Sequence, residues 1–255
     1  MQDNVHLTSR KLNMIIGLLR IKNEARWIER VVRSIQPVCG RILILDDHST
    51  DGTPEICESL GCQVFRSPFD GIHEARDKDY LLEKAWETGA AIGDYCLMVD
   101  GDEALHADDI PVLLAAAGSG TVCGSMHIVY LWDREDQVRV DRWYREFRRP
   151  SLFRLTARNL TFRRTEHGGN FHCSSAPAQL LSQITPIPVR LLHYGYLHRE
   201  DRVRKFHWYN SVDPHNTLED EYRHMVIGDL FPTDAAFRWA GPLRLEALCS
   251  HRSAA

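Results

Sequence analysis

Two carboxylates separated by one glycine, Asp100-Gly101-Asp102, are the feature of the sequence best suited to chemistry. Magnesium and manganese prefer oxygen ligands, and in proteins they usually take one or two carboxylates together with phosphates of the substrate. A glycine between the carboxylates lets the backbone turn and lets a ligand approach closely. The triplet directly follows an apolar segment and is followed by Glu103. This context favours a metal site over a solvated acidic turn.

Polar residues also follow two other apolar segments of the first half. One set is Arg20, Lys22, Asn23 and Glu24, and the other is Asp46 and Asp47. In an open α/β sheet, ligands bind at the carboxyl ends of the strands. If the apolar segments are neighbouring strands, these side chains meet at one edge, where they could hydrogen bond a base or ribose and hold a hard cation.

The elements around these residues alternate between two periodicities. Short apolar runs, typical of buried strands, lie at residues 14–19, 41–45, 63–65 and 95–99. Apolar residues at helical spacing predict helices over 25–35 and 75–88, and Pro54 fits the first turn of another helix. Strands that alternate with helices predict a parallel sheet covered by helices. The expected class is therefore α/β, with a Rossmann-like sheet.

The second half has a different pattern. Strands are expected at 121–130 and 138–143 around a charged turn at 133–136, and at 188–192; helices are expected at 199–211, at 219–226 and after Pro242. A stretch rich in arginine runs from 142 to 164, and 166–175 has no periodicity and is interpreted as a loop. No internal repeat or linker is present, so we expect one domain with a nucleotide-binding half (1–105) and an acceptor half (106–255).

Composition excludes several classes of protein. The hydrophobic fraction of 44% and the charged fraction of 26% are typical of a globular chain. A net charge of -4 argues against nucleic-acid binding. No apolar run reaches the ~20 residues of a bilayer span, and the start of the chain lacks the apolar core of a secretory signal, so a cytoplasmic protein is expected, with peripheral membrane attachment left open. The seven cysteines form no C-x-x-C pair, which argues against disulfides and zinc.

Three segments resemble motifs of family 2 glycosyltransferases, in the order and spacing of that family. Residues 19–24 (LRIKNE) resemble its opening "kNE" element, and residues 42–53 (ILILDDHSTDGT) resemble its "vDDgSxDgT" element. Residues 98–103 (MVDGDE) resemble its "lDaDE" metal motif. Residues 149–154 (RPSLFR) and 193–196 (HYGY) match short bacterial members less closely. The resemblance implies a GT-A fold, a mixed and mostly parallel sheet flanked by helices, with a smaller α+β part on the acceptor side.

The resemblance also implies a nucleoside-diphosphate sugar donor, UDP being favoured, and Mg²⁺ or Mn²⁺ as cofactor. It places the following residues at the donor: Arg20, Asn23, Glu24, Asp46, Asp47, Arg76, Asp100 and Gly101. Within this set, Asp47 is expected to hydrogen bond the base, and Asp100 to lie by the ribose and the metal. The family usually has asparagine where this chain has Asp77, which places the Arg76 contact in question.

For the metal, the resemblance implies Asp100 and Asp102 as ligands, with His193 as a further candidate. A histidine buried under a turn is the alternative interpretation of His193. In the arginine-rich stretch, Arg149 and Arg154 are candidate phosphate contacts, although most of these arginines are expected to pair with acids at the surface. The helix at 199–211 carries Lys205, His207 and Trp208, which are candidates to line the acceptor cleft.

Members of this family are generally inverting, and an inverting transfer needs one general base that deprotonates the acceptor. Glu166 is the first candidate for the base, followed by His167 and His172. The order Glu166-His167 departs from the His-Glu pair of many short members, and Glu166 could instead pair with Arg163 or Arg164.

Other functions remain open at this stage. A nucleotidyltransferase also uses acidic residues at strand ends, but it would carry a glycine-rich basic loop where this chain has residues 20–24. A non-catalytic module that binds sugar or nucleotide is the third possibility, while a dehydrogenase lacks its G-x-G-x-x-G sequence. The expected transfer is of a hexose or an N-acetylhexosamine, but the sequence does not specify which sugar. The acceptor is also open, and a saccharide, a lipid-linked sugar, a peptide and a natural-product precursor are all compatible with the sequence. A homodimer is the default expectation from base rates.

Overall fold

The computed structural model describes residues 13–163, 173–213, 216 and 220–250. Its first half contains four parallel strands, β1 (Ile15–Ile21), β2 (Arg41–Asp46), β3 (Gln63–Arg66) and β4 (Tyr95–Met98). β1 lies between β2 and β4, and β3 pairs with the other edge of β2. The four strands predicted for this half are confirmed, with ends shifted by at most two residues.

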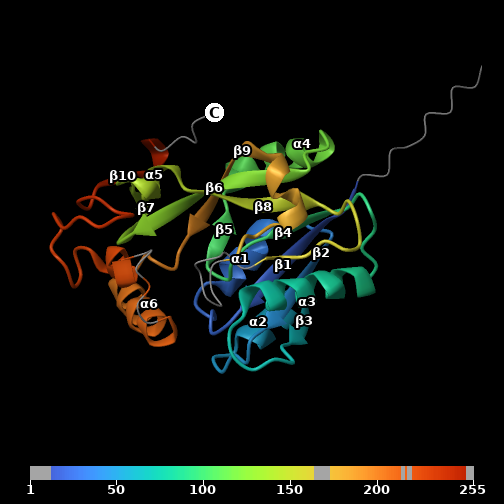
Figure 1. Cartoon of the computed structure of the whole chain (residues 1–255), viewed down its shortest axis with the longest axis horizontal. Helices are drawn as coiled ribbons and strands as arrows, with labels where there is room; N and C mark the ends of the chain where they lie inside the picture. The colour runs from blue at the N-terminus through green and yellow to red at the C-terminus, as the bar shows by residue number, and fades with distance from the viewer. Residues whose placement is uncertain (1–12, 164–172, 214–215, 217–219, 251–255) are drawn as a thin grey trace, which may run out of the picture.

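Both faces of this parallel sheet are covered, which explains the nearly continuous apolar sequence of β1. Along β1, Ile15 and Leu19 belong to one core cluster, and Ile16 and Leu18 belong to the other. The helices α1 (Ile28–Ile35) and α2 (Thr53–Ser59) pack on the first face, and α3 (Glu74–Glu87) packs on the second (Figure 1). The alternation predicted from the sequence is therefore confirmed.

The second half continues the same sheet. Its strands are β5 (Glu103–Leu105), β6 (Cys123–Trp132), β7 (Arg134–Arg139), β8 (Arg148–Arg154), β9 (Ile184–His193) and β10 (Leu245–Ala247). β8 runs antiparallel to both β4 and β6, so the main order is β10-β7-β6-β8-β4-β1-β2-β3, with β5 and β9 paired off this path. The result is a mixed α/β sheet of the GT-A, Rossmann-like type, as the sequence predicted.

The described residues of this half contain the helices α4 (Ile110–Gly118), α5 (Trp143–Glu146), which is a single turn, and α6 (Arg199–Val212). Short 3₁₀ segments lie at Ala107–Asp109, Ala178–Gln183, Asp220–Val226 and Leu248–Ser250. The helix α6 lies beyond the end of β7, away from the parallel strands (Figure 1). The helix predicted at 199–211 is therefore confirmed, and it is extended by one residue.

Several predictions for the second half are wrong in detail. The strand expected at 138–143 begins at Arg134 and ends at Arg139, because Asp133, with φ of 60°, turns the chain before the charged residues. The segment 219–226 is not one helix, since Glu221 and Tyr222 have φ of 53° and 61°. The segment after Pro242 was expected to be helical, but it contains β10, which pairs with β7.

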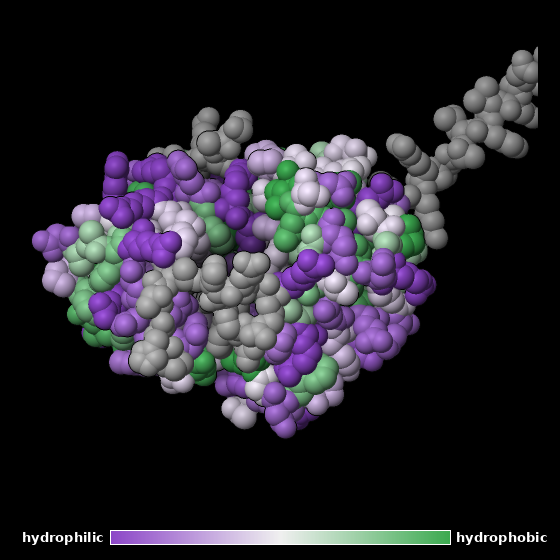
Figure 2. All heavy atoms as spheres, viewed as in Figure 1, coloured by the Kyte–Doolittle hydropathy of each residue, from purple (hydrophilic) through white to green (hydrophobic). Residues whose placement is uncertain are grey.

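The surface carries apolar side chains without gathering them into one large patch on the face seen in Figure 2, where hydrophobic and hydrophilic residues are interspersed. The large apolar side chains that are exposed come from several elements: Ile92, Leu114, Leu181, Ile184, Trp208, Val212 and Leu230. In the described parts of the chain, no helix combines the length and apolar character needed to cross a bilayer.

Candidate active site

The register of the parallel strands brings the predicted site residues to one edge of the sheet. Ile21 lies opposite Asp46 on β2, and Leu18 lies opposite Met98 on β4. The residues that follow these positions therefore emerge side by side at the carboxyl ends of three adjacent strands, where an open α/β sheet binds its ligands. The predicted convergence of the three motifs is present in the structure.

The part of this edge formed by the ends of β1 and β2 and the start of α3 carries a chain of alternating charges. The Arg20 guanidinium donates to Asp47 Oδ2 at 2.8 Å and to Asp77 Oδ2 at 2.8 Å. Lys22 Nζ lies 3.3 Å from the same Asp47 oxygen, and Arg76 Nε donates to Asp77 Oδ1 at 2.9 Å. The Asp47 and Asp77 side chains are only 3% and 2% exposed, so the two acids orient three cations at a partly open edge.

We expect Asp77→Asn to lower the free energy of unfolding by about 2 kcal/mol, because hydrogen bonds to charged groups contribute ~1.5–3 kcal/mol. The substitution removes the charge that Arg20 and Arg76 share. Asp47 still pairs with Arg20, which keeps the loss below the ~3–5 kcal/mol of a buried charge left alone. Urea denaturation measures this change. Glu83→Gln, at an exposed position of α3, should change stability by less than about 0.5 kcal/mol, and an equal loss in both variants would contradict the prediction.

Two residues assigned to the donor from the sequence have partners in the protein itself. Asn23 adopts φ of 54°, its amide N–H donates to Ser49 Oγ at 2.9 Å, and its Oδ1 accepts from the Thr50 N–H at 2.8 Å. Asp46, only 3% exposed, accepts from the Ser49 N–H at 3.2 Å. The Asn23 side chain therefore fastens the loop after β2 to the end of β1, and the Asp46 side chain holds the first turn of that loop.

Asp100 and Asp102 have different surroundings. The Asp100 side chain is 48% exposed, and its Oδ2 accepts from Arg149 at 2.6 Å. Arg149 also pairs with the buried Glu103. This contact follows from strand register: Leu97 lies opposite Leu152 on antiparallel β8, so three residues further Asp100 meets Arg149. Arg149 is thus a neighbour of the metal motif, where the sequence suggested a phosphate contact.

The Asp102 side chain is 4% exposed and is enclosed by residues of the second half. Lys205 on α6 donates to Asp102 Oδ2, and His193 Nδ1, at the end of β9, lies 3.4 Å from Asp102 Oδ1. Burial alone raises the pKa of Asp102, but the interactions with Lys205 and His193 outweigh it and hold that pKa well below its usual range. Asp102 is therefore a buried carboxylate that stays ionised.

Two glycines leave space for these carboxylates. A Cβ on Gly101 would lie 2.8 Å from Glu24 Cγ, so the glycine of the metal motif admits the Glu24 side chain beside it. A Cβ on Gly195 would overlap both Asp102 Oδ2 and Lys205 Nζ. Burial, and then the nearby Asp102 charge, raise the pKa of Glu24 to about 8. Close backbone approach thus gathers several carboxyl groups around Gly101.

The oxygen and nitrogen ligands available here suit a divalent cation that is held mainly by the phosphates of a substrate. In the described part of the chain, no group of three or more His, Cys, Asp and Glu side chains is arranged around one metal position. Both ring nitrogens of His193 are buried without a hydrogen-bond partner, and the residue is 9% exposed. An ionised carboxylate beside an imidazole with unused nitrogens suits Mg²⁺ or Mn²⁺ bound through one or two protein ligands plus phosphates.

The remaining predicted residues are placed as follows. Glu166, His167 and His172, the candidates for the general base, lie outside the described residues. The phosphate contact suggested for Arg154 is wrong, because Arg154 lies opposite Tyr95, at the amino end of β4 and far from Asp100. On α6, His207 and Trp208 are exposed, whereas Lys205 contacts the metal motif.

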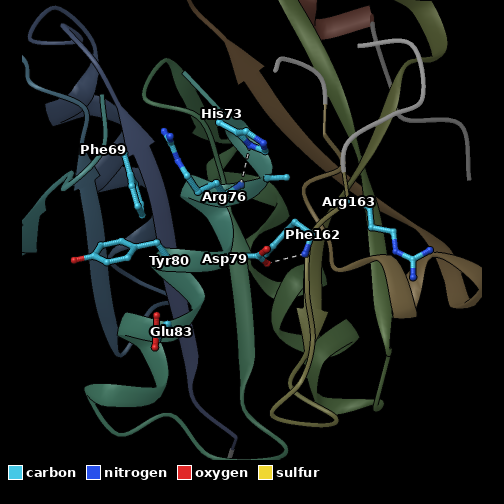
Figure 3. Close-up of a pocket in the computed structure, with 9 residues that line it drawn as sticks. Phe69, His73, Arg76, Asp79, Tyr80, Glu83, Phe162 and Arg163 are labelled. Carbon is cyan, nitrogen blue, oxygen red and sulfur yellow. Dashed lines mark hydrogen bonds between the residues drawn. The ribbon is translucent and has the colours of Figure 1, made fainter. Parts of the chain in front are cut away.

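A hollow of about 690 Å³ opens beside Arg76, between α3 and residues 162 and 163. Figure 3 shows Phe69 and Tyr80 on one side of it and Phe162 and Arg163 on the other. The Arg76 guanidinium lies 4.2 Å from the centre of the Phe69 ring. Of the donor residues predicted from the sequence, only Arg76 lines this hollow, so it is distinct from the carboxylate site.

Comparison with known families agrees with this architecture and its acidic strand ends. Residues 19–178 match the model of the family described as glycosyl transferase family 2. This match covers more than half of the chain, and the chain therefore belongs to glycosyl transferase family 2.

The curated relatives carry only a general description. An uncharacterised glycosyltransferase of Rickettsia felis is 26% identical over 129 residues, which are 49% of this chain and 43% of that protein. Another uncharacterised glycosyltransferase, from Rickettsia bellii, is 31% identical over 105 residues, 40% of this chain and 33% of its own length. The chain thus matches less than half the length of these relatives.

Solved structures resemble parts of the chain. Glucosyl-3-phosphoglycerate synthase from Mycobacterium tuberculosis, crystallised with Mn²⁺, UDP and glucosyl-3-phosphoglycerate, is 21% identical with a TM-score of 0.35, over 46% of this chain and 44% of that one. A 4-diphosphocytidyl-2C-methyl-D-erythritol synthase is 15% identical with a TM-score of 0.41, over 56% of this chain and 76% of that one.

Proposed function

We propose that this chain is a metal-dependent, inverting glycosyltransferase that moves a sugar from a nucleoside diphosphate, UDP in the first instance, to an acceptor. Membership of glycosyl transferase family 2 supports the reaction class. The observation that carries the proposal is the buried Asp102 carboxylate, with the His193 ring 3.4 Å away, at the carboxyl edge of the parallel strands. Such a site is suited to the diphosphate of a donor.

The two sides of the edge have separate tasks in this proposal. Lys22, Arg20 and Arg76 bind and orient the nucleotide, and Asp47 and Asp77 hold those cations in place. Fixed cations beside a diphosphate stabilise the negative charge that develops on it as the sugar leaves. Asp47, which already accepts from Arg20 and Lys22, is also the candidate partner of the base.

Mg²⁺ or Mn²⁺ is proposed to be held by one or two protein ligands together with the donor phosphates, with Asp102 as the main ligand and Asp100 or His193 as the second. When bound, such an ion supplies Lewis-acid stabilisation of the departing diphosphate. Arg149 keeps Asp100 in position, and the partial exposure of Asp100 leaves it accessible to the ribose. Deprotonation of the acceptor is assigned to Glu166, with His167 or His172 as alternatives, because an inverting transfer needs one general base on the acceptor side.

Calorimetric titration with UDP-, GDP- and dTDP-sugars, with and without Mn²⁺, tests the proposal. We expect one UDP-sugar to bind at least about tenfold more tightly with Mn²⁺ than without it, which corresponds to ~1.4 kcal/mol. That sugar then serves as the donor in an acceptor screen. Failure of every donor to bind in either condition would contradict the proposal. Binding of a free nucleoside triphosphate in place of a sugar donor would favour a nucleotidyltransferase.

A further inference from the structure

The Lys205 side chain lies where a cation bound to Asp102 would be expected. Its Nζ donates to Asp102 Oδ2, and its side chain is 13% exposed. Gly195 lets both groups pack against the backbone at this point, because a Cβ there would overlap each of them. The Tyr196 ring also faces the ammonium group, with its centre 6.0 Å away. The metal motif thus holds a cation supplied by the protein itself.

The charges around Asp102 disfavour the binding of a divalent cation in the absence of a nucleotide. Lys205 carries an ammonium group on a flexible stem, and this group pairs with Asp102 at a position where the Lys205 side chain is only 13% exposed. A divalent cation that binds Asp102 must approach this ammonium closely, and like charges at partly buried positions repel strongly. In the free protein, Lys205 therefore neutralises the Asp102 carboxylate. A divalent cation that arrives without a nucleotide is repelled by the Lys205 ammonium group.

A nucleoside diphosphate changes this balance, because its phosphates accept both a divalent cation and an ammonium. Lysine binds phosphate as a point charge and carries it on a flexible four-carbon stem. Its ammonium can therefore move from Asp102 to a nearby phosphate without any movement of α6. The negative charge of the donor then replaces the interaction that Lys205 loses, and Asp102 becomes free for the metal.

We propose that Lys205 is a resident counter-ion of Asp102 that makes metal binding depend on the donor: it occupies the carboxylate in the free protein and transfers to the diphosphate when metal and nucleotide bind together. This inference rests on the proposed function. Lys205 acts as a positioning residue, which decides when Asp102 is available to metal. A purely structural ion pair would give no such linkage between two ligands.

Binding of Mn²⁺, followed by the electron paramagnetic resonance signal of the free ion, tests the inference with and without UDP. In the wild-type protein, UDP should raise the affinity for Mn²⁺ by about 100-fold, within the usual range of coupling between sites. In Lys205→Met, Mn²⁺ alone should bind at least about tenfold more tightly than in the wild type, and the enhancement by UDP should fall by at least the same factor. Lys205→Arg, which keeps the charge, should retain weak binding of Mn²⁺ alone.

Arg204→Met is the matched control, because it removes a positive charge from the adjacent position of α6, where the side chain is 59% exposed and pairs with Asp201. It should leave both Mn²⁺ affinities unchanged. Wild-type protein that binds Mn²⁺ equally well with and without UDP would overturn the inference without any variant. The inference is also overturned if Lys205→Met binds Mn²⁺ in the absence of UDP no better than the wild type, while UDP still increases the Mn²⁺ affinity of the variant. The proposed function is unaffected by that result. Absence of Mn²⁺ binding in every condition would instead reject the metal-dependent function itself.

Discussion

Asp102→Asn should abolish the effect of Mn²⁺ on donor binding and slow sugar transfer by about 10³-fold, or ~4 kcal/mol in activation free energy. The amide has the size of the carboxylate but not its charge, so it binds a divalent cation far more weakly and does not neutralise Lys205. A metal ion is expected to contribute several kcal/mol of transition-state stabilisation. Calorimetry with the donor identified in the titration panel, followed by release of the nucleoside diphosphate, measures both effects.

Asp108→Asn is the control for this variant, because it makes the same chemical change in a nearby turn where the side chain is 84% exposed. It should alter neither donor binding nor turnover. If Asp102→Asn still bound the donor more tightly with Mn²⁺ than without it, Asp102 would not be a metal ligand. Circular dichroism of both variants separates a local change at the site from loss of the fold.

Gly195→Ala should reduce transfer by about 10²-fold while leaving the fold intact, since displacement of catalytic groups by ~1 Å can cost that much. The added methyl group would overlap Asp102 Oδ2 and Lys205 Nζ, which are the ends of side chains and can move aside. Asp102 then shifts from its position and Lys205 loses its contact. Because the displaced Asp102–Lys205 pair is largely buried, we expect the free energy of unfolding to fall by about 1.5–3 kcal/mol, less than the total stability of a typical domain.

Gly118→Ala provides the comparison for this effect. A Cβ at this position of α4 would meet no atom within 4 Å, so the same substitution adds a methyl group in open space. Turnover should stay at the wild-type level in Gly118→Ala. Equal activity of the Gly195 variant and the wild type would show that the site tolerates a displaced Asp102. Unfolding of Gly195→Ala at room temperature would show that the close approach is needed for the fold instead.

The parallel half of the fold was predictable from sequence because its signals are local. Residues 14–19 and 95–99 are apolar runs that the sheet buries on both faces, and each carries its polar residues at the end. Position along the chain was therefore enough to place Arg20 and Asp100 at one edge. The second half was less predictable, because the single turn residue Asp133 moved the start of β7 and a short apolar tail paired as β10.

The surroundings of Asp102 could not be obtained from sequence in the same way. Lys205 lies 103 positions after Asp102 in the sequence, and only the course of β9 and α6 brings it to the metal motif. The sequence suggested an acceptor-side position for it, and Gly195 carried no signal beyond its place in the segment 193–196. Arg149 was singled out, but its partners follow from the register of β8 against β4. Periodicity indicates which residues face the core and leaves strand register open.

The antiparallel pairing of β4 with β8 has a mechanical consequence. It places the strands of both halves in one continuous hydrogen-bonded sheet, with Tyr95, Cys96 and Leu97 paired to residues of β8. Enzymes that bind a ligand by hinge closure rotate two domains about a few loop residues. Here such a rotation would tear backbone hydrogen bonds in the centre of the molecule. We therefore expect any change in access to the carboxylate site to involve side chains and elements at the margin of the sheet, while the central strands keep their backbone hydrogen bonds.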